Sequence, residues 1–160
     1  MRYCFIIGPA LCVAILDQWS KQAVVEFLPL HDGIVLTSFF NLAHVRNYGA
    51  AFGFLNDPSL NFQIWLFSGA TLLAAVLILS MAGKAPPRAH GLFIALGAIL
   101  GGAAGNLVDR LRLGAVVDFL DFHYAGYHWP AFNVADIAIC VGAALTALFL
   151  FKNPPPKADG

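Results

Sequence analysis

The sequence predicts an all-α membrane protein, with four transmembrane helices and a small extramembrane β platform on the outer face. Its 160 residues are 59% hydrophobic and only 11% charged, and the mean hydropathy is +0.74. This composition is typical of an integral membrane protein. Four long apolar runs each approach the roughly 20 residues that cross a bilayer. We expect one domain over residues 1–160, with spans at about 3–26, 62–82, 91–110 and 132–151, and an outer β-rich segment at 29–58.

Charge and cysteine usage narrow the function classes. The formal net charge is zero and there is no basic run, so nothing suggests a nucleic-acid partner. Three cysteines, Cys4, Cys12 and Cys140, lie in apolar runs without CxxC or Cys/His spacing. This pattern favours neither a disulfide framework nor a zinc site, and we expect all three as small hydrophobic core residues.

The first apolar run resembles the core of a secretory signal peptide, but the residues after it favour a retained helix. No small-x-small cleavage site follows, and DQWSKQAVVEFL continues the helical pattern. Asp17 and Lys21 stand four residues apart, so they share a helix face and can form an ion pair. That pair could anchor a helix end near the membrane surface, or it could support a functional site.

The segment from Pro29 to Pro58 has turn signals and short β-rich runs. Asp32-Gly33 indicates one turn and Asn47-Tyr48-Gly49 a second. An aromatic strand pair here could lie half in the membrane interface as a platform that captures substrate. The aromatic residues concerned are Phe39, Phe40, Phe52 and Phe54. The alternative is an ordinary structured loop.

The third span combines packing glycines with a polar end. The four-residue spacings of Gly97, Gly101 and Gly105 are typical of close helix contact. A polar cluster, Asn106, Asp109, Arg110 and Arg112, then ends the run. An acid at a helix C-terminus is unfavourable for the helix dipole, so Asp109 should have a cationic partner: Arg110, Arg112 or Lys21 across the bundle.

Four spans place both termini on one side of the membrane, and the basic residues indicate which side. Five lie on the termini side: Arg2, Lys84, Arg88, Lys152 and Lys157. Four lie on the other: Lys21, Arg46, Arg110 and Arg112. Three of those four belong to motif-like clusters, so the ordinary loop cations favour cytoplasmic termini.

Two aspartates occur where an apolar membrane chain tolerates acids least. Asp118 follows the β-branched pair Val116 and Val117, and Asp136 begins a run with no further charge until Lys152. An Asp near the centre of a transmembrane helix costs about 2.5–3.5 kcal/mol, whereas each Ile, Val, Leu or Phe returns about 0.3–0.6. The last span can therefore hold one acid. An acid retained at membrane depth indicates a functional site.

The motifs present favour carboxylate chemistry. There is no HExxH motif for a zinc protease and no GxSG setting for a serine protease. A metal held by Asp121, His123 and His128 would require a flexible, glycine-containing loop as its scaffold. Two carboxyls brought together share a proton, so one can act as a base toward water and the other as an acid. Such a dyad needs no cofactor. If 116–122 is extended, Asp118 and Asp121 face opposite ways, which leaves Asp118 to pair with Asp136.

Five blocks in order resemble lipoprotein signal peptidase, the signal peptidase II family of bacteria: DQWSK (17–21), NYGAAFGF (47–54), GGAAGNLVDR (101–110), VVDFLDF (116–122) and FNVAD (132–136). The resemblance implies an aspartic endopeptidase of the inner membrane, which removes signal peptides from diacylglyceryl-modified prolipoproteins just before the lipidated cysteine. It implies Asp118 and Asp136 as the catalytic dyad.

The resemblance also implies substrate-binding or supporting residues: Asp17, Lys21, Asn47, Gly49, Gly102, Asn106, Asp109, Arg110, Phe132, Asn133 and Ala135. The implied partners are prolipoprotein signal peptides, membrane lipid and globomycin-type inhibitors, and we expect a monomer without a cofactor or metal.

Three other readings stay open. Asn133 and Asp136 could form only a helix cap. The acids could form the relay of a small proton-coupled transporter, although they cluster toward one face and no internal repeat is visible. A structural bundle packed through its glycines would leave the acids unexplained.

Overall fold

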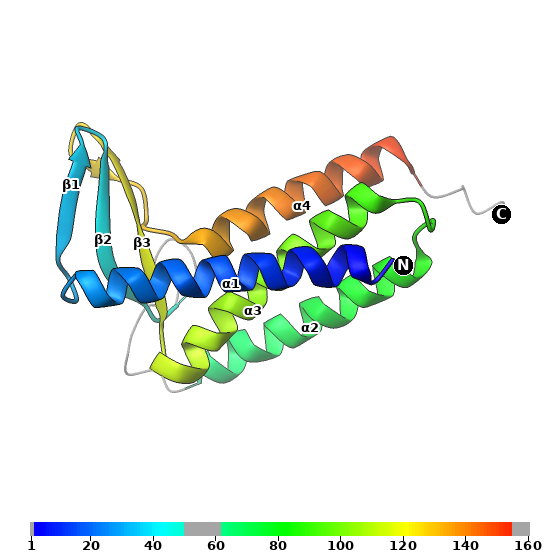
Figure 1. Cartoon of the computed structure of the whole chain (residues 1–160), viewed down its shortest axis with the longest axis horizontal. Helices are drawn as coiled ribbons and strands as arrows, with labels where there is room; N and C mark the ends of the chain where they lie inside the picture. The colour runs from blue at the N-terminus through cyan, green and yellow to red at the C-terminus, as the bar shows by residue number, and fades with distance from the viewer. Residues whose placement is uncertain (1, 50–61, 155–160) are drawn as a thin grey trace.

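A computed structural model describes residues 2–49 and 62–154. It contains four long helices, α1 Cys4–Phe27, α2 Gln63–Lys84, α3 His90–Leu113 and α4 Val134–Lys152. All four are long and apolar enough to cross a membrane. They form one elongated bundle, in which the start of α1 and the end of α4 lie at the end away from the strands (Figure 1). The expected membrane all-α class is therefore confirmed.

A small antiparallel sheet stands at the other end of the bundle (Figure 1). Its strands are β1 Gly33–Thr37, β2 Phe40–Asn47, β3 Val116–Tyr124 and β4 Tyr127–His128, in the order β1-β2-β3-β4. The β platform is thus confirmed, but it also draws on the chain between α3 and α4. The pairing of β2 with β3 places Asn47 opposite Val116, at the start of the strand that carries Asp118.

The hairpin turn of the sheet differs from the expected one. The run from Ile34 to Val45 is not a single strand, because it turns at Ser38 and Phe39. The hydroxyl of Thr37 accepts a hydrogen bond from the Phe39 backbone N–H at 3.3 Å. This turn uses neither glycine nor asparagine, so the usual hairpin signals did not reveal it. The expected platform residues Phe52 and Phe54 lie outside the described residues.

Helix α3 is the central helix, and its glycines let the neighbouring helices approach. Half of its most apolar stretch is buried, a much larger share than in the other three helices. A Cβ on Gly97 would meet the backbone of Ile6, and one on Gly101 would meet Ala10, both in α1. The expectation of close glycine packing is confirmed.

The prediction that the cysteines lie in the core was wrong. Cys4, Cys12 and Cys140 are all exposed on the helices. A transmembrane helix is apolar on its lipid-facing side as well as on its packed side. An apolar neighbourhood in the sequence therefore did not separate core from lipid-facing positions.

Candidate active site

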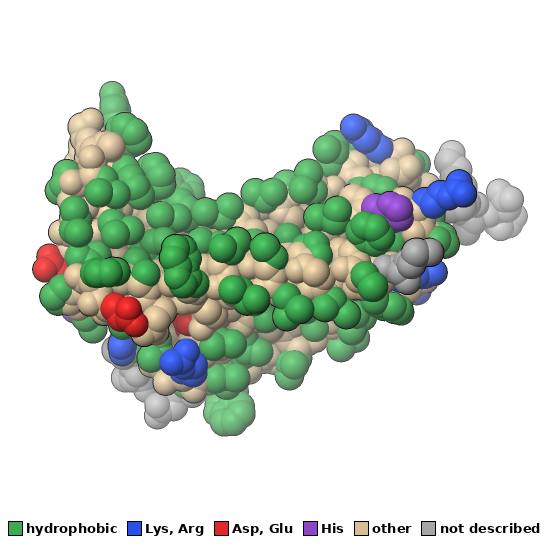
Figure 2. Space-filling view, viewed as in Figure 1, with side chains coloured by type: hydrophobic (Ala, Val, Ile, Leu, Met, Phe, Trp, Pro, Cys, Tyr) green, Lys and Arg blue, Asp and Glu red, His purple; other side chains and the backbone are tan. Residues whose placement is uncertain are grey.

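A cavity of about 710 Å³ lies where α3, α4 and the sheet meet. Its wall includes the side chains of Asp118 from β3 and Asp136 from α4, together with Asn106 and Arg110 from α3. Most of the remaining wall is apolar, including Val45, Trp129, Pro130, Phe132, Ile137, Cys140 and Val141. The space-filling view shows a broad hollow between the sheet and the far end of the helices, bordered by hydrophobic side chains (Figure 2). The cavity joins two acids to an apolar surface.

Strand β3 presents Asp118 to this cavity and keeps Asp121 away from it. Asp118 is only 3% exposed and accepts hydrogen bonds from Asn133 Nδ2 at 2.7 Å and Asn47 Nδ2 at 3.1 Å. Asp121 instead contacts Asn41 Nδ2 at 2.9 Å and His128 Nδ1 at 2.8 Å. Side chains three residues apart on a strand face opposite ways. The predicted separation of the two acids is confirmed.

Asp136 lies in the first turn of α4, because the helix begins at Val134 and not at residue 132. One carboxylate oxygen accepts the Asn133 backbone N–H at 3.2 Å, and the Asn133 side chain accepts the Asp136 N–H at 2.9 Å. The predicted capping box is therefore present. The other carboxylate oxygen accepts from Asn106 Nδ2 at 2.9 Å. Asp136 caps the helix and faces the site at once. The free-energy cost of placing this aspartate in a membrane helix is lower here than at the middle of the helix, since the dipole at the helix N-terminus favours an anion.

Three asparagines are each held in one orientation by a group that can only donate. The amide oxygen of Asn47 accepts the Gly49 N–H at 2.9 Å, and that of Asn133 accepts the Asp136 N–H. The amide oxygen of Asn106 faces the Lys21 ammonium at 2.8 Å. Backbone N–H and ammonium groups have no acceptor, so each amide must turn its NH₂ to the other side. All three NH₂ groups then point at a carboxylate of Asp118 or Asp136.

Burial raises the pKa of Asp118 to about 7, and the nearby negative charge of Asp136 adds to the rise. The hydrogen bonds from Asn47 and Asn133 and the charge of Lys21 oppose this shift. A carboxyl with such a pKa can hold a proton near neutrality and also release it. Perturbed carboxyls of this kind in a cavity indicate a functional site.

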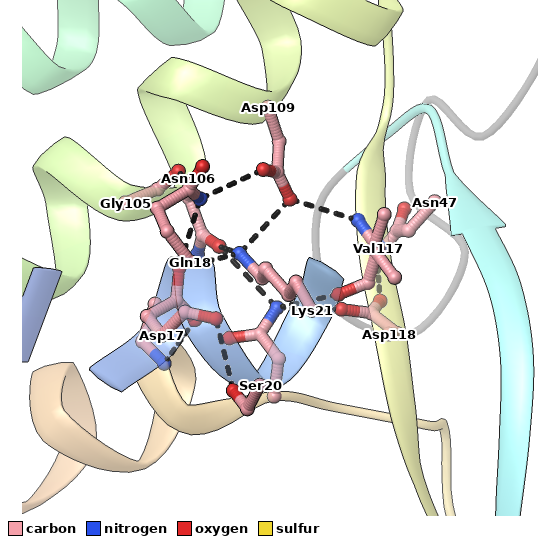
Figure 3. A network of polar contacts seen from close by, with 12 residues as sticks. Asp17, Gln18, Ser20, Lys21, Asn47, Gly105, Asn106, Asp109, Val117 and Asp118 are labelled. Atoms are coloured by element: carbon pink, nitrogen blue, oxygen red, sulfur yellow. Dashed lines mark hydrogen bonds and ion pairs between the residues drawn. The ribbon is translucent and has the colours of Figure 1, made fainter. Parts of the chain in front are cut away.

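A buried charged cluster lies beside Asp118 (Figure 3), and Asn106 connects it to Asp136. Lys21 is 2% exposed and contacts Asp17 Oδ2 at 2.8 Å and Asp109 Oδ2 at 3.0 Å. Among the three cations expected for Asp109, Lys21 is the one that forms the ion pair. The Asp17–Lys21 pair is also confirmed, but it lies inside the bundle, so it does not serve as an anchor at the membrane surface.

The remaining residues of the predicted set divide between the cavity and the packing around it. Arg110 donates to the Gly49 carbonyl at 3.3 Å and lies over the Phe67 ring at 4.6 Å, beside the cavity. Phe132 lines the cavity and pairs with Leu120 through its backbone.

Two predicted residues serve helix packing instead of the cavity. Gly102 is buried, and a Cβ there would meet the backbone of Ala135 in α4. Ala135 is fully buried and donates its backbone N–H to Asp17 at 2.9 Å.

Sequence reasoning missed Gln18, which bonds to Asp109 at 2.8 Å and to the Gly105 carbonyl at 3.1 Å. Its signal was present, since Gln18 is the second residue of the DQWSK block. It also missed the cavity wall formed by Val45, Trp129 and Ile137. In the described ranges, 2–49 and 62–154, no three His, Cys, Asp or Glu side chains group closely enough to hold a metal ion.

Comparison with known proteins decides the family. The family model described as Signal peptidase (SPase) II matches residues 9–152. The chain belongs to the signal peptidase II family. It is 48% identical over 160 residues to the lipoprotein signal peptidase of Nitratidesulfovibrio vulgaris (strain DP4), covering 98% of this chain and 95% of that one. It is 51% identical over 145 residues to that of Oleidesulfovibrio alaskensis (strain ATCC BAA-1058 / DSM 17464 / G20), covering 90% and 92%.

A solved structure described as a bacterial membrane enzyme has the same fold. It superimposes with a TM-score of 0.82 at 29% identity and covers 96% of this chain and 92% of its own. Together with the four apolar helices, the signal peptidase II match identifies a bacterial membrane peptidase. The transporter hypothesis gains no support from these relatives.

Proposed function

We propose that this peptidase is an aspartic endopeptidase, in which Asp118 and Asp136 form the catalytic dyad. The observation that carries the proposal is the convergence of both carboxyls on one cavity, with three oriented amides donating to them. Burial and the neighbouring charge keep the pKa of Asp118 near 7, so the pair can hold one shared proton at neutral pH.

In the proposed reaction, the ionised member of the pair takes a proton from a water that attacks the scissile carbonyl. The protonated member donates its proton to the carbonyl oxygen, and a proton then passes to the leaving amine. The guanidinium of Arg110 supports this step, because a cation beside the cavity stabilises the negative charge that builds up on the carbonyl oxygen before its protonation is complete. The oriented amides hold the carboxyls in place before substrate arrives.

The proposed substrates are diacylglyceryl-modified prolipoproteins, cut just before the lipidated cysteine. Relatives named lipoprotein signal peptidase, about half identical over nearly the whole chain, support this assignment. The cavity wall suits it too, since apolar residues along α4, Ile137, Cys140 and Val141, extend from Asp136 along the lipid-facing side. Globomycin-type inhibitors would compete for the same cavity. We propose that the chain works as a single-domain monomer.

We further propose that the protein lies in the inner membrane with cytoplasmic termini and an outward-facing active site. The start of α1 and the end of α4 lie at one end of the bundle and the sheet lies at the other (Figure 1). Of the cations at the sheet end, Lys21 is buried in the charged cluster and Arg110 is half-buried beside the cavity. Neither is an ordinary loop cation. The remaining loop charges therefore favour cytoplasmic termini under the positive-inside rule.

The test uses purified protein in detergent and a prolipoprotein peptide with and without the diacylglyceryl group. We expect cleavage of the lipidated peptide only, stopped by globomycin and abolished in Asp136→Asn. Cleavage of both peptides at equal rates would contradict the proposed substrate. Substantial activity in a folded Asp136→Asn protein would contradict the dyad.

A further inference from the structure

Three residues that contact the Lys21 ammonium are also bonded to Asp136 or to the residues next to Asp118 and Asp136. The Lys21 ammonium has three N–H donors, and Asp17, Asp109 and the amide oxygen of Asn106 take them at 2.8, 3.0 and 2.8 Å. This complete use of a buried ammonium leaves Lys21 no donor for substrate. Its effect on catalysis must therefore pass through its partners (Figure 3).

Two of those partners hold the backbone directly before each catalytic aspartate. Asp17 Oδ1 accepts the N–H of Ala135, the residue before Asp136, at 2.9 Å. Asp109 Oδ2 accepts the N–H of Val117, the residue before Asp118, at 3.1 Å. One ammonium thus ties together the start of α4 and strand β3, which come from different parts of the chain.

The third partner, Asn106, is hydrogen-bonded to the side chain of Asp136. Asn106 accepts from Lys21 and donates to Asp136 Oδ1 at 2.9 Å. Asn133 also donates to the Asn106 oxygen, but at 3.3 Å, while its shorter bond of 2.7 Å goes to Asp118. The ammonium is therefore the stronger of the two groups that orient Asn106. Without it the amide could turn and present its oxygen to the Asp136 carboxylate, which is repulsive unless that carboxyl is protonated.

We propose that Lys21 is a positioning residue that sets the spacing of the Asp118–Asp136 pair and keeps an amide donor on Asp136, acting through Asp17, Asp109 and Asn106. This inference rests on the proposed aspartic mechanism and adds a residue that acts on it without touching substrate. Lys21 contacts Asp17 on its own helix and Asp109 on α3, and its charge acts on Asp118 on β3. The charges of Asp136 on α4 and Arg110 on α3 also interact with Asp118.

The positive charge of Lys21 should also affect the pH dependence of the reaction. The charge of Lys21 lowers the pKa of Asp118, opposing the effect of burial. Replacing Lys21 by a neutral residue removes that charge and also frees the Asn106 amide. Both losses disfavour the ionised carboxylates, so both limbs of the rate profile should move to higher pH.

The experiment compares two variants of the full chain with one matched control. Lys21→Met removes the ammonium but leaves two buried carboxylates without a counter-charge, and it can therefore fail to fold. The double variant Lys21→Gln/Asp109→Asn removes one positive and one negative charge, so the cluster keeps its net charge and a polar side chain at both positions. Gln22→Met is the control, since Gln22 is exposed on the same helix and bonds only Glu26 in the described residues.

For each variant, kcat, KM and the pH profile are measured on lipidated peptide and normalised to the folded fraction. Infrared spectra report the protonated carboxyl band that is lost in Asp118→Asn.

We expect the double variant to lose about 10- to 100-fold in kcat with KM nearly unchanged, because a small misplacement of reacting groups is costly. Its rate profile should move to higher pH, since the pair loses the charge of Lys21 and a fixed amide donor from Asn106. Lys21→Met, if it folds, should also move its alkaline limb and carboxyl band to higher pH. Gln22→Met should match wild type.

Two results would overturn the inference: wild-type kcat in the folded double variant, or a reduced kcat with the wild-type pH profile and carboxyl band. Either would make Lys21 merely structural. Failure of the dyad itself is distinguishable, because it would appear as activity in Asp118→Asn measured in the same series.

Discussion

Asp118 and Asp121 stand three residues apart on one strand, and each accepts an amide N–H from an asparagine of β2, yet their titrations move in opposite directions. Asp118 has Asn47 as this partner and Asp121 has Asn41. Burial raises the pKa of Asp118 to about 7, and the charge of Asp136 adds to it. At Asp121 the smaller burial also raises the pKa, but hydrogen bonds from His128 and Asn41 outweigh it and hold the pKa below the ordinary value.

The comparison shows that an amide donor alone does not tune a carboxyl for catalysis. Both sites have that donor, so burial and the second neighbour make the difference: a carboxylate beside Asp118 and an imidazole beside Asp121. Side chains alternate between the two faces of a strand, so Asp118 and Asp121 lie on opposite faces of β3 and have different surroundings. The inner face of β3 therefore supplies acid–base chemistry, while the outer face supplies an exposed contact between a carboxylate and an imidazole.

The largest expected effect comes from removing each acid in turn. Asp118→Asn should lower kcat about a thousandfold or more, because it removes the shared proton while hardly changing side-chain volume. Asp121→Asn should leave kcat nearly unchanged. Cleavage assays with thermal unfolding in detergent as the folding control measure this. Equal losses in both variants would remove the distinction between the two faces of the strand.

A smaller effect is expected from the matched pair of asparagines. Asn47→Ala should lower kcat about tenfold, since one of the two amide donors to Asp118 is lost. Because that hydrogen bond lowers the pKa of Asp118, its loss should move the alkaline limb to higher pH. Asn41→Ala should change neither kcat nor the limb. A pH profile altered by Asn41→Ala and not by Asn47→Ala would reverse the account.

The aromatic platform should affect capture of substrate more than turnover. Phe39 is 53% exposed in the turn between β1 and β2, and Phe40 stacks on Phe122 with ring centroids 4.6 Å apart. Phe39→Ser should raise KM several-fold with little change in kcat, because such contacts are made equally in the ground and transition states. Phe151→Ser, at an exposed site in the last turn of α4, is the control. A defect confined to kcat would contradict the platform role.

The smallest effect concerns stability at the outer face of β3. The pKa of Asp121 is depressed in the folded protein, so its contribution is present above the unfolded value of 3.8 and is lost as pH falls through the lower folded value. Because the His128 side chain is 55% exposed, its contact with Asp121 contributes less than about 1 kcal/mol to the stability of the folded protein. Asp121→Asn should therefore lower the Tm slightly at neutral pH and not at all in strong acid. A difference that grew on acidification would have the wrong sign.

Hydrophobic run lengths and turn residues were enough to predict the four helices and a strand platform, because both depend on local pattern. Alternation along 116–122 also separated Asp118 from Asp121. The pairing of β2 with β3 was not predictable, since it joins residues about 70 to 80 positions apart along the chain. The choice of Lys21 as partner of Asp109, and the orientation of Asn106 that follows, depended on helix packing through Gly101 and Gly105.

The central claim, that Asp118 and Asp136 work as a pair sharing one proton, is tested most directly by the pH dependence of kcat/KM for the wild-type protein on lipidated peptide. Since kcat/KM reports groups of the free enzyme, its alkaline limb should fall near the pKa of about 7 that burial and Asp136 give Asp118. Activity should decline above that limb as the shared proton is lost, and below a second limb as both carboxyls become protonated. A bell-shaped profile with these limbs is the predicted result. A flat profile from acid pH to well above neutrality, in protein that stays folded throughout, would contradict the dyad.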